Sequence, residues 1–90
     1  MTEESRPLPD PDLSFLCWSI ATGAMVSLGL AKPPDAEEVK VNLPVAKHSI
    51  DILEMLRVKT EGNRTDEETK VLMGLLYDLR MRYVEVSRGK

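Results

Sequence analysis

The chain contains a run of 19 residues, 13–31, without a single charged side chain. Asp10 or Asp12 can cap the start of a helix there, and Gly29 suits the left-handed residue that often ends one. The run therefore predicts a helix over about residues 12–29. Its large apolar side chains point in every direction around the helix axis, and a helix that is apolar on all sides must be buried on all sides.

A run of this length raises the question of a membrane span, because spanning becomes possible at about 18 apolar residues. Serine, threonine and glycine dilute its hydropathy, and Trp18 lies inside the segment instead of at an end. The preceding residues are acidic, which also argues against a secretory signal. We therefore expect neither a membrane span nor a membrane-bound role.

The remainder of the chain can shelter only part of this first helix. We expect the uncovered part to be the interface of a homo-oligomer, a dimer or a dimer of dimers, because large exposed apolar patches mark interfaces. Four-residue spacing also puts the small residues Ser19, Gly23 and Ser27 in one row, which lets another helix approach closely. That helix can belong to a second copy or to the same chain. The expected interface residues are Phe15, Trp18, Ser19, Gly23, Met25 and Ser27.

Two more helices are predicted over about residues 43–60 and 65–87, after a linker over 30–42. Pro44 suits the first turn of one, Gly62 suits its end, and Thr65 with Glu68 forms a capping box for the other. The short loop makes the two helices antiparallel, with facing residue numbers that sum to about 124. The resulting apolar pairs are Leu53 with Leu72, Ile50 with Leu75, and Ala46 with Leu79.

These elements predict an all-α fold of three helices. A long apolar first helix precedes an antiparallel helical hairpin, and the helices pack as a homo-oligomeric bundle. Residues 12–90 are expected to form a single helical domain. Residues 1–11 are proline-rich and acidic. We expect them to form a disordered arm, because they bury too little apolar surface to offset the entropy of ordering.

The composition excludes several kinds of chemistry. One cysteine and one histidine cannot build an ordinary zinc site, and a net charge of −3 disfavours nucleic-acid binding. Cys17 falls in an apolar helix, where burial makes a thiol inert, so a reactive pair with His48 is not expected. The sequence predicts no catalytic residue, metal or cofactor, and it favours a protein that is not an enzyme.

Three polar residues are candidates for contacts between subunits: Asp51, Arg80 and Tyr83. Arginine and tyrosine are side chains that interfaces favour. The expected register places Arg80 near Pro44, about two turns from Asp51, so these residues are not expected to pair within one chain.

Two strings, K-T-x-G-N at 59–63 and L-R-M-R-Y at 79–83, resemble a bacterial family of short helical proteins, DUF1844. The resemblance runs from Val41 to Glu85 and includes Ser19–Ala21 and Leu28–Gly29. It implies a bacterial, cytoplasmic protein and no particular reaction. Arg64 stands where the family usually has leucine, which removes an apolar contact at the start of the last helix without altering the fold.

The leading functional interpretation is a structural or interaction module that self-associates through its first helix and can also bind another protein. The alternative is a ligand-binding or enzymatic site formed between subunits around Asp51, Arg80 and Tyr83. Binding of nucleic acid through the basic residues near the C-terminus is a third and weaker interpretation.

Overall fold

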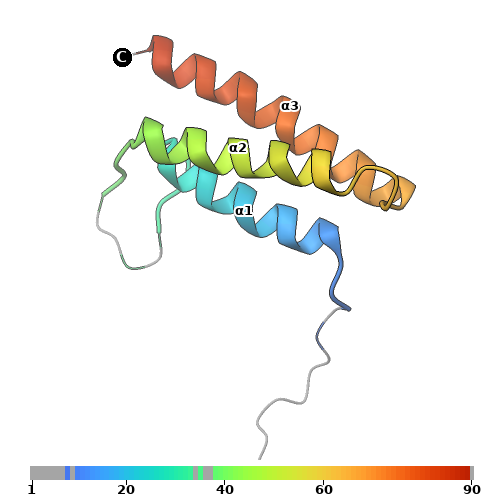
Figure 1. Ribbon diagram of the computed structural model, residues 1–90. Coiled ribbons are helices and arrows are strands. Elements are labelled where there is room, and N and C mark those ends of the chain that lie inside the picture. Colours follow the sequence, from blue (N-terminus) through green and yellow to red (C-terminus); the bar gives the residue numbers. More distant parts are fainter. Residues whose placement is uncertain (1–7, 9, 34, 36–37, 90) are drawn as a thin grey trace, which may run out of the picture.

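The computed structural model describes residue 8, residues 10–33, residue 35 and residues 38–89. These residues form three α-helices and no strand: α1 (Leu13–Ser27), α2 (Leu43–Lys59) and α3 (Asp66–Arg88) (Figure 1). The expectation of an all-α, three-helix fold is therefore confirmed. Most of the expected arm, residues 1–7 and 9, lies outside the described residues, whereas Leu8, Asp10 and Pro11 are exposed.

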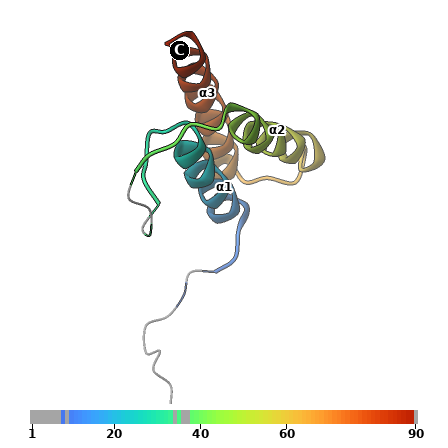
Figure 2. The same cartoon turned by 90° about the vertical axis from the view of Figure 1, so that its left-hand side faces the viewer.

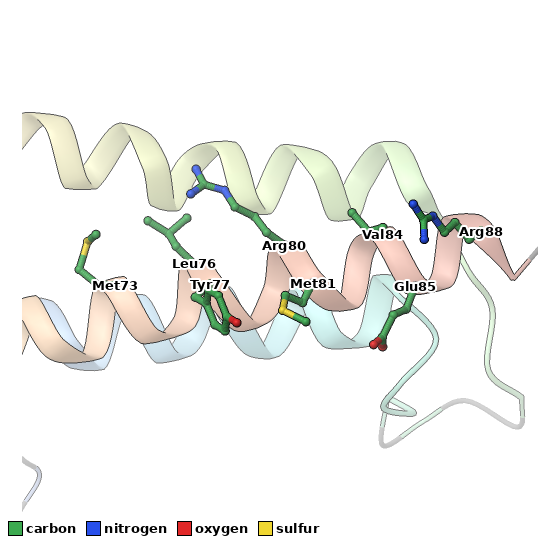
Figure 3. A pocket seen from close by; sticks show the side chains of 8 residues that line it. All are labelled: Met73, Leu76, Tyr77, Arg80, Met81, Val84, Glu85 and Arg88. Atoms are coloured by element: carbon green, nitrogen blue, oxygen red, sulfur yellow. The ribbon is translucent and has the colours of Figure 1, made fainter.

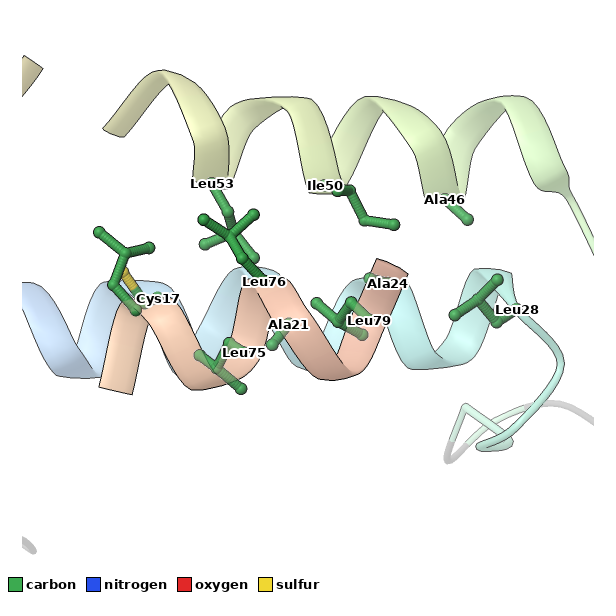
Figure 4. Packing of buried hydrophobic residues seen from close by; sticks show 11 residues of the cluster. Cys17, Ala21, Ala24, Leu28, Ala46, Ile50, Leu53, Leu75, Leu76 and Leu79 are labelled. Carbon is green, nitrogen blue, oxygen red and sulfur yellow. The ribbon is translucent and has the colours of Figure 1, made fainter. Parts of the chain in front are cut away.

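The helices alternate in direction along the chain, so α1 and α3 run the same way and α2 runs against both (Figure 1). Each helix packs against the other two. Their buried side chains form one cluster between the three helices (Figure 4). Its members are Cys17, Ala21, Ala24 and Leu28 from α1 and the residue after it, Ala46, Ile50 and Leu53 from α2, and Leu72, Leu75, Leu76 and Leu79 from α3.

Small side chains line the buried side of α1. Cys17, Ala21 and Ala24 recur at helical spacing and are at most 4% exposed. Ala46 of α2 is fully buried as well and lies near the Leu28 end of α1 (Figure 4). Short side chains at facing positions let helix axes approach closely. This row, and not the row of Ser19, Gly23 and Ser27, is where α1 meets the rest of its own chain.

Polar side chains cap the helices as the sequence predicts. The Asp12 carboxylate accepts a hydrogen bond from the backbone N–H of Phe15 at 2.9 Å. At the start of α3, Thr65 and Glu68 form the expected capping box. The other oxygen of Glu68 accepts from the backbone N–H of Leu13 at 3.2 Å. One carboxylate therefore satisfies backbone donors at the first turns of α1 and α3, where negative charge also favours the helix dipoles.

Hydrogen bonds from Arg64 stabilise the connection between α2 and α3. Its Nη1 donates to the carbonyl of Arg57 at 2.8 Å and to the Thr60 hydroxyl at 3.1 Å, and its Nε donates to the Thr69 hydroxyl at 3.0 Å. Arg64 and Thr69 flank the N-cap Thr65 at the two positions where an apolar pair often packs. The arginine therefore replaces that apolar contact by hydrogen bonds, and the helical hairpin still forms.

The expected register of the hairpin is wrong at its open end. The predicted register places Arg80 near Pro44, but its Nη2 forms an ion pair with the carboxylate of Glu54 at 2.9 Å. The register assumes helices that lie side by side along their whole length. In the structure α2 and α3 run in opposite directions and diverge in both views, most clearly in Figure 2, so they cross at an angle (Figures 1 and 2). A single sum of residue numbers cannot describe such a crossing.

Gly29 reverses the chain after α1. Its φ is +79°, and the backbone N–H groups of Gly29 and Leu30 donate to the carbonyls of Val26 and Met25 at 3.0 and 2.9 Å. This pair of bonds is the Schellman motif that ends many helices. A Cβ on Gly29 would lie 2.7 Å from Cγ2 of Val41, so the linker packs where a side chain would begin.

We expect Gly29→Ala to destabilise the fold more than Gly62→Ala. Both glycines have positive φ, which costs an L-residue about 1 kcal/mol, but a Cβ at position 62 would meet nothing within 4 Å. The clash with Val41 adds to the backbone cost at position 29 only. Urea unfolding followed by circular dichroism measures both variants, and equal losses of unfolding free energy would contradict the role of the Val41 contact.

Candidate functional site

The outer face of α1 is left uncovered by the other two helices. Phe15 is 60% exposed, Trp18 55% and Leu16 46%. Phe15 and Leu16 border an open depression of about 500 Å³ at the start of the helix, together with Pro11 and Ser19. An apolar surface of this kind on an uncharged helix is characteristic of an interface.

The expected row of small residues lies partly on this outer face. Ser19 and Gly23 are exposed, and a Cβ on Gly23 would meet nothing within 4 Å. None of the three described helices therefore occupies the surface beside Gly23. Ser27 is half-buried, and its carbonyl accepts from the backbone N–H of Asn42 at 2.8 Å. Met25 is half-buried as well and packs against the core cluster of its own chain.

Two exposed hydroxyl groups on α1, those of Ser19 and Thr22, are bonded to their own helix. Ser19 Oγ donates to the carbonyl of Phe15 at 3.1 Å, and Thr22 Oγ1 donates to the carbonyl of Trp18 at 2.9 Å. Burying a hydroxyl that has no partner is costly, whereas one that already donates its proton can lose water at much lower cost. The polar groups of Ser19 and Thr22 therefore do not prevent this face from being buried.

Trp18 lies at the edge of α1 that is closer to α3. It borders a shallow depression of about 310 Å³ whose other lining residues belong to α3, among them Lys70, Gly74 and Asp78. Gly74 is exposed, and a Cβ there would also meet nothing within 4 Å. The uncovered apolar surface of α1 thus extends to the side of α3.

A second exposed apolar face lies on α3, and the sequence analysis did not identify it. Tyr77 is 70% exposed, and Met73, Met81 and Val84 are 45–46% exposed. These side chains border an open depression of about 680 Å³, in which Arg80 points toward α2 (Figure 3). Their spacing of four, four and three residues is a helical stripe that could have been recognised. The leucines of α3 already supply one apolar face, so this second stripe is not needed to explain why α3 packs in the core.

The structure brings Asp51, Arg80 and Tyr83 together, although the sequence analysis expected Arg80 to be remote from Asp51. All three border one depression of about 210 Å³ between α2 and α3. Lys47 forms an ion pair with Asp51 at 2.9 Å, and Arg80 is bound to Glu54. Both charged candidates are therefore already neutralised within the chain, which leaves little charge to hold a ligand.

Glu54 joins the two helices of the hairpin. It accepts hydrogen bonds from Arg57, one turn away on α2, and from Arg80 on α3. The hydrogen bonds from Arg57 and Arg80 lower the pKa of Glu54 from its ordinary value of 4.5 to about 2. The carboxylate thus stays charged in the folded protein at pH values where it would be protonated in the unfolded chain.

The structure shows no reactive pair of Cys17 and His48. Cys17 is fully buried, while His48 is exposed on α2. Burial, followed by the nearby Glu68 carboxylate, raises the pKa of the Cys17 thiol, which keeps it in its unreactive form. Among the described residues, no three histidine, cysteine, aspartate or glutamate side chains are grouped so that they could hold a metal ion.

None of the described helices combines the length and the apolar character that a membrane crossing requires.

Comparison with known families gives a match over most of the chain. The family described as "Domain of unknown function (DUF1844)" matches residues 10–85, which include α1, α2 and most of α3. The chain belongs to this family. Neither the curated proteins nor the solved structures give a match. Membership in DUF1844 agrees with the resemblance of the strings at 59–63 and 79–83, and it assigns no reaction to any residue.

We expect Glu54→Gln to destabilise this DUF1844 protein at neutral pH and much less in acid. The lowered pKa means that the charged form of Glu54 contributes its full stabilisation above about pH 4.5 and loses it as the pH falls toward 2. Urea midpoints of the wild type and the variant should therefore converge over this window. Glu38→Gln, in the exposed linker, is the control; a difference between Glu54→Gln and wild type that is constant with pH would contradict the assignment.

Proposed function

We propose that this chain is a small structural and interaction module that associates with a second copy of itself through the outer face of α1. The observation that carries the proposal is the exposure of Phe15, Leu16 and Trp18 on a helix without any charged residue. In water, these three side chains alone keep a large apolar surface hydrated, and covering it is favourable.

The shape of the face supports another helix as its occupant. Phe15, Ser19 and Gly23 recur at four-residue spacing along one side of α1, and Gly23 leaves a gap in this row because it has no side chain. Helices pack by placing ridges of one into grooves of the other, and small residues let their backbones come close. Most soluble homo-oligomers are built on two-fold axes, so the same face of a second copy is the simplest partner.

We place this module in the bacterial cytoplasm. The supports are the family resemblance and the presence of one cysteine, which lies buried as a free thiol. The alternative function, a ligand or enzymatic site between subunits, has one point in its favour: Asp51, Arg80 and Tyr83 border the same depression. Their existing ion pairs make this alternative the weaker of the two.

Phe15→Ser should weaken self-association without unfolding the chain. Phe15 lies outside the buried core, so its loss removes apolar surface from the interface only. Truncating a central aromatic residue at an interface costs about 2 kcal/mol or more. In sedimentation equilibrium at micromolar concentration, the wild type should be a dimer or larger, and the variant should shift toward the monomer.

Val58→Ser is a matched control, because Val58 is 58% exposed but lies on α2, away from this face. Gly23→Leu gives a second readout: it should favour the helix by its higher propensity, yet it should block the close approach of another helix. A wild type that is monomeric at tens of micromolar would contradict the proposal. So would an equal effect of Phe15→Ser and Val58→Ser.

A further inference from the structure

On the outer face of α3, two pairs of side chains lie at equal distances along the chain on either side of Tyr77. Four residues to either side lie Met73 and Met81, and eleven residues to either side lie Asp66 and Arg88. Eleven residues make three helical turns, so these five positions share one side of α3. The inner positions are the same residue type, and the outer positions carry opposite charges.

We propose that this face binds the same face of a second copy, with the two α3 helices antiparallel and the two-fold axis passing near Tyr77. The inference deepens the proposed function by naming a second self-association surface. It does not require that the α1 face be correct, because the two faces can be disrupted separately.

The apolar part of this face is self-complementary in the antiparallel arrangement. Met73 would lie opposite Met81 of the second copy, and the two Tyr77 rings would meet at the axis. Tyr77 is the most exposed of the three at 70%, and all three border the open depression on this side of α3 (Figure 3). Methionine side chains adapt to irregular surfaces and contact aromatic rings favourably, so such a pairing can fill the groove.

The charged residues at the two ends of the face are complementary in the same arrangement. Asp66 would lie opposite Arg88 of the second copy, and Lys70 would lie beside Glu85 of the second copy. None of these four side chains forms an ion pair with another described residue. A parallel arrangement would instead place each charge beside its own kind at both ends, which costs free energy and opposes that orientation.

Glu85 adds a separate argument for the antiparallel pairing. It lies in the last turn of α3, where the helix dipole disfavours a negative side chain. Within the described residues no cation offsets it through an ion pair. Lys70 of a second copy would supply that cation at the place where the chain itself does not.

Two surfaces of this kind explain how a dimer of dimers can arise from one short chain. The face on α1 and the face on α3 each pair with themselves across a two-fold axis. When two such axes meet at right angles, four copies close into a tetramer and no open chain forms. From Asp66 to Arg88 the paired α3 helices would lie in contact over about 33 Å.

The pairing is tested by charge reversal at Lys70 and Glu85. In Lys70→Glu alone, or Glu85→Lys alone, both contacts across the axis become like-charged, and we expect association through α3 to weaken about tenfold. In an equimolar mixture of the two single variants, each mixed pair regains two opposite-charge contacts. Sedimentation velocity and native mass spectrometry should therefore show mixed assemblies that form more tightly than either variant forms alone.

Both substitutions are at exposed positions, and neither opposes the dipole of α3, so each variant is expected to fold. Circular dichroism confirms this before association is measured. The inference is overturned if neither single variant associates more weakly than wild type, or if the mixture associates no better than the single variants.

Phe15→Ser separates this inference from the proposed function. If the variant of α1 reduces the assembly while charge reversal on α3 has no effect, the α3 pairing is wrong and the proposed function stands. If charge reversal acts as described while Phe15→Ser has no effect, the α3 pairing stands and association through α1 is wrong. The two-surface assembly predicts that Phe15→Ser and charge reversal on α3 each weaken association. In a variant that combines the two changes, the losses of association free energy should add.

Discussion

The burial of α1 is the constraint on which the rest of the structure depends. No charged residue occurs between Asp12 and Lys32, so no side of this helix is suited to water by charge. The chain buries one side of it with Cys17, Ala21 and Ala24 against α2 and α3. Two helices can surround a third on one side only, and the opposite side of α1 remains exposed.

The inner and outer sides of α1 carry different kinds of side chain. On the inner side, small side chains allow close packing, and Glu68 ties the first turn of α1 to the capping box of α3. On the outer side, the hydroxyls of Ser19 and Thr22 are already bonded to the helix backbone. The outer side therefore combines large apolar side chains with hydroxyl groups that already donate a hydrogen bond and can lose water at low cost. This combination is suited to contact with another protein.

Local residue patterns in the sequence were sufficient to predict where the helices lie and where they end. Asp12, Thr65 with Glu68, and the positive-φ glycines at 29 and 62 act within a few residues, so their roles could be predicted directly. The contact of Arg80 with Glu54 could not be predicted, because it depends on the angle at which α2 and α3 cross (Figure 2), and no residue pattern within one helix encodes that angle. The outer face of α3 was visible in the spacing of Met73, Tyr77 and Met81, but nothing in the sequence tells which of two apolar faces is buried in the chain's own core.

Trp18 is the only tryptophan of the chain, which makes its fluorescence the most direct test of whether a second copy covers the outer face of α1. The measurement is the emission maximum and iodide quenching of Trp18 over a dilution series from about 100 μM to below 100 nM, beside sedimentation over the same range. The account predicts a red shift and stronger quenching as the assembly dissociates, and Phe15→Ser should move the transition to higher concentration. A Trp18 signal that is constant across the series, with a monomer at every concentration, would contradict it.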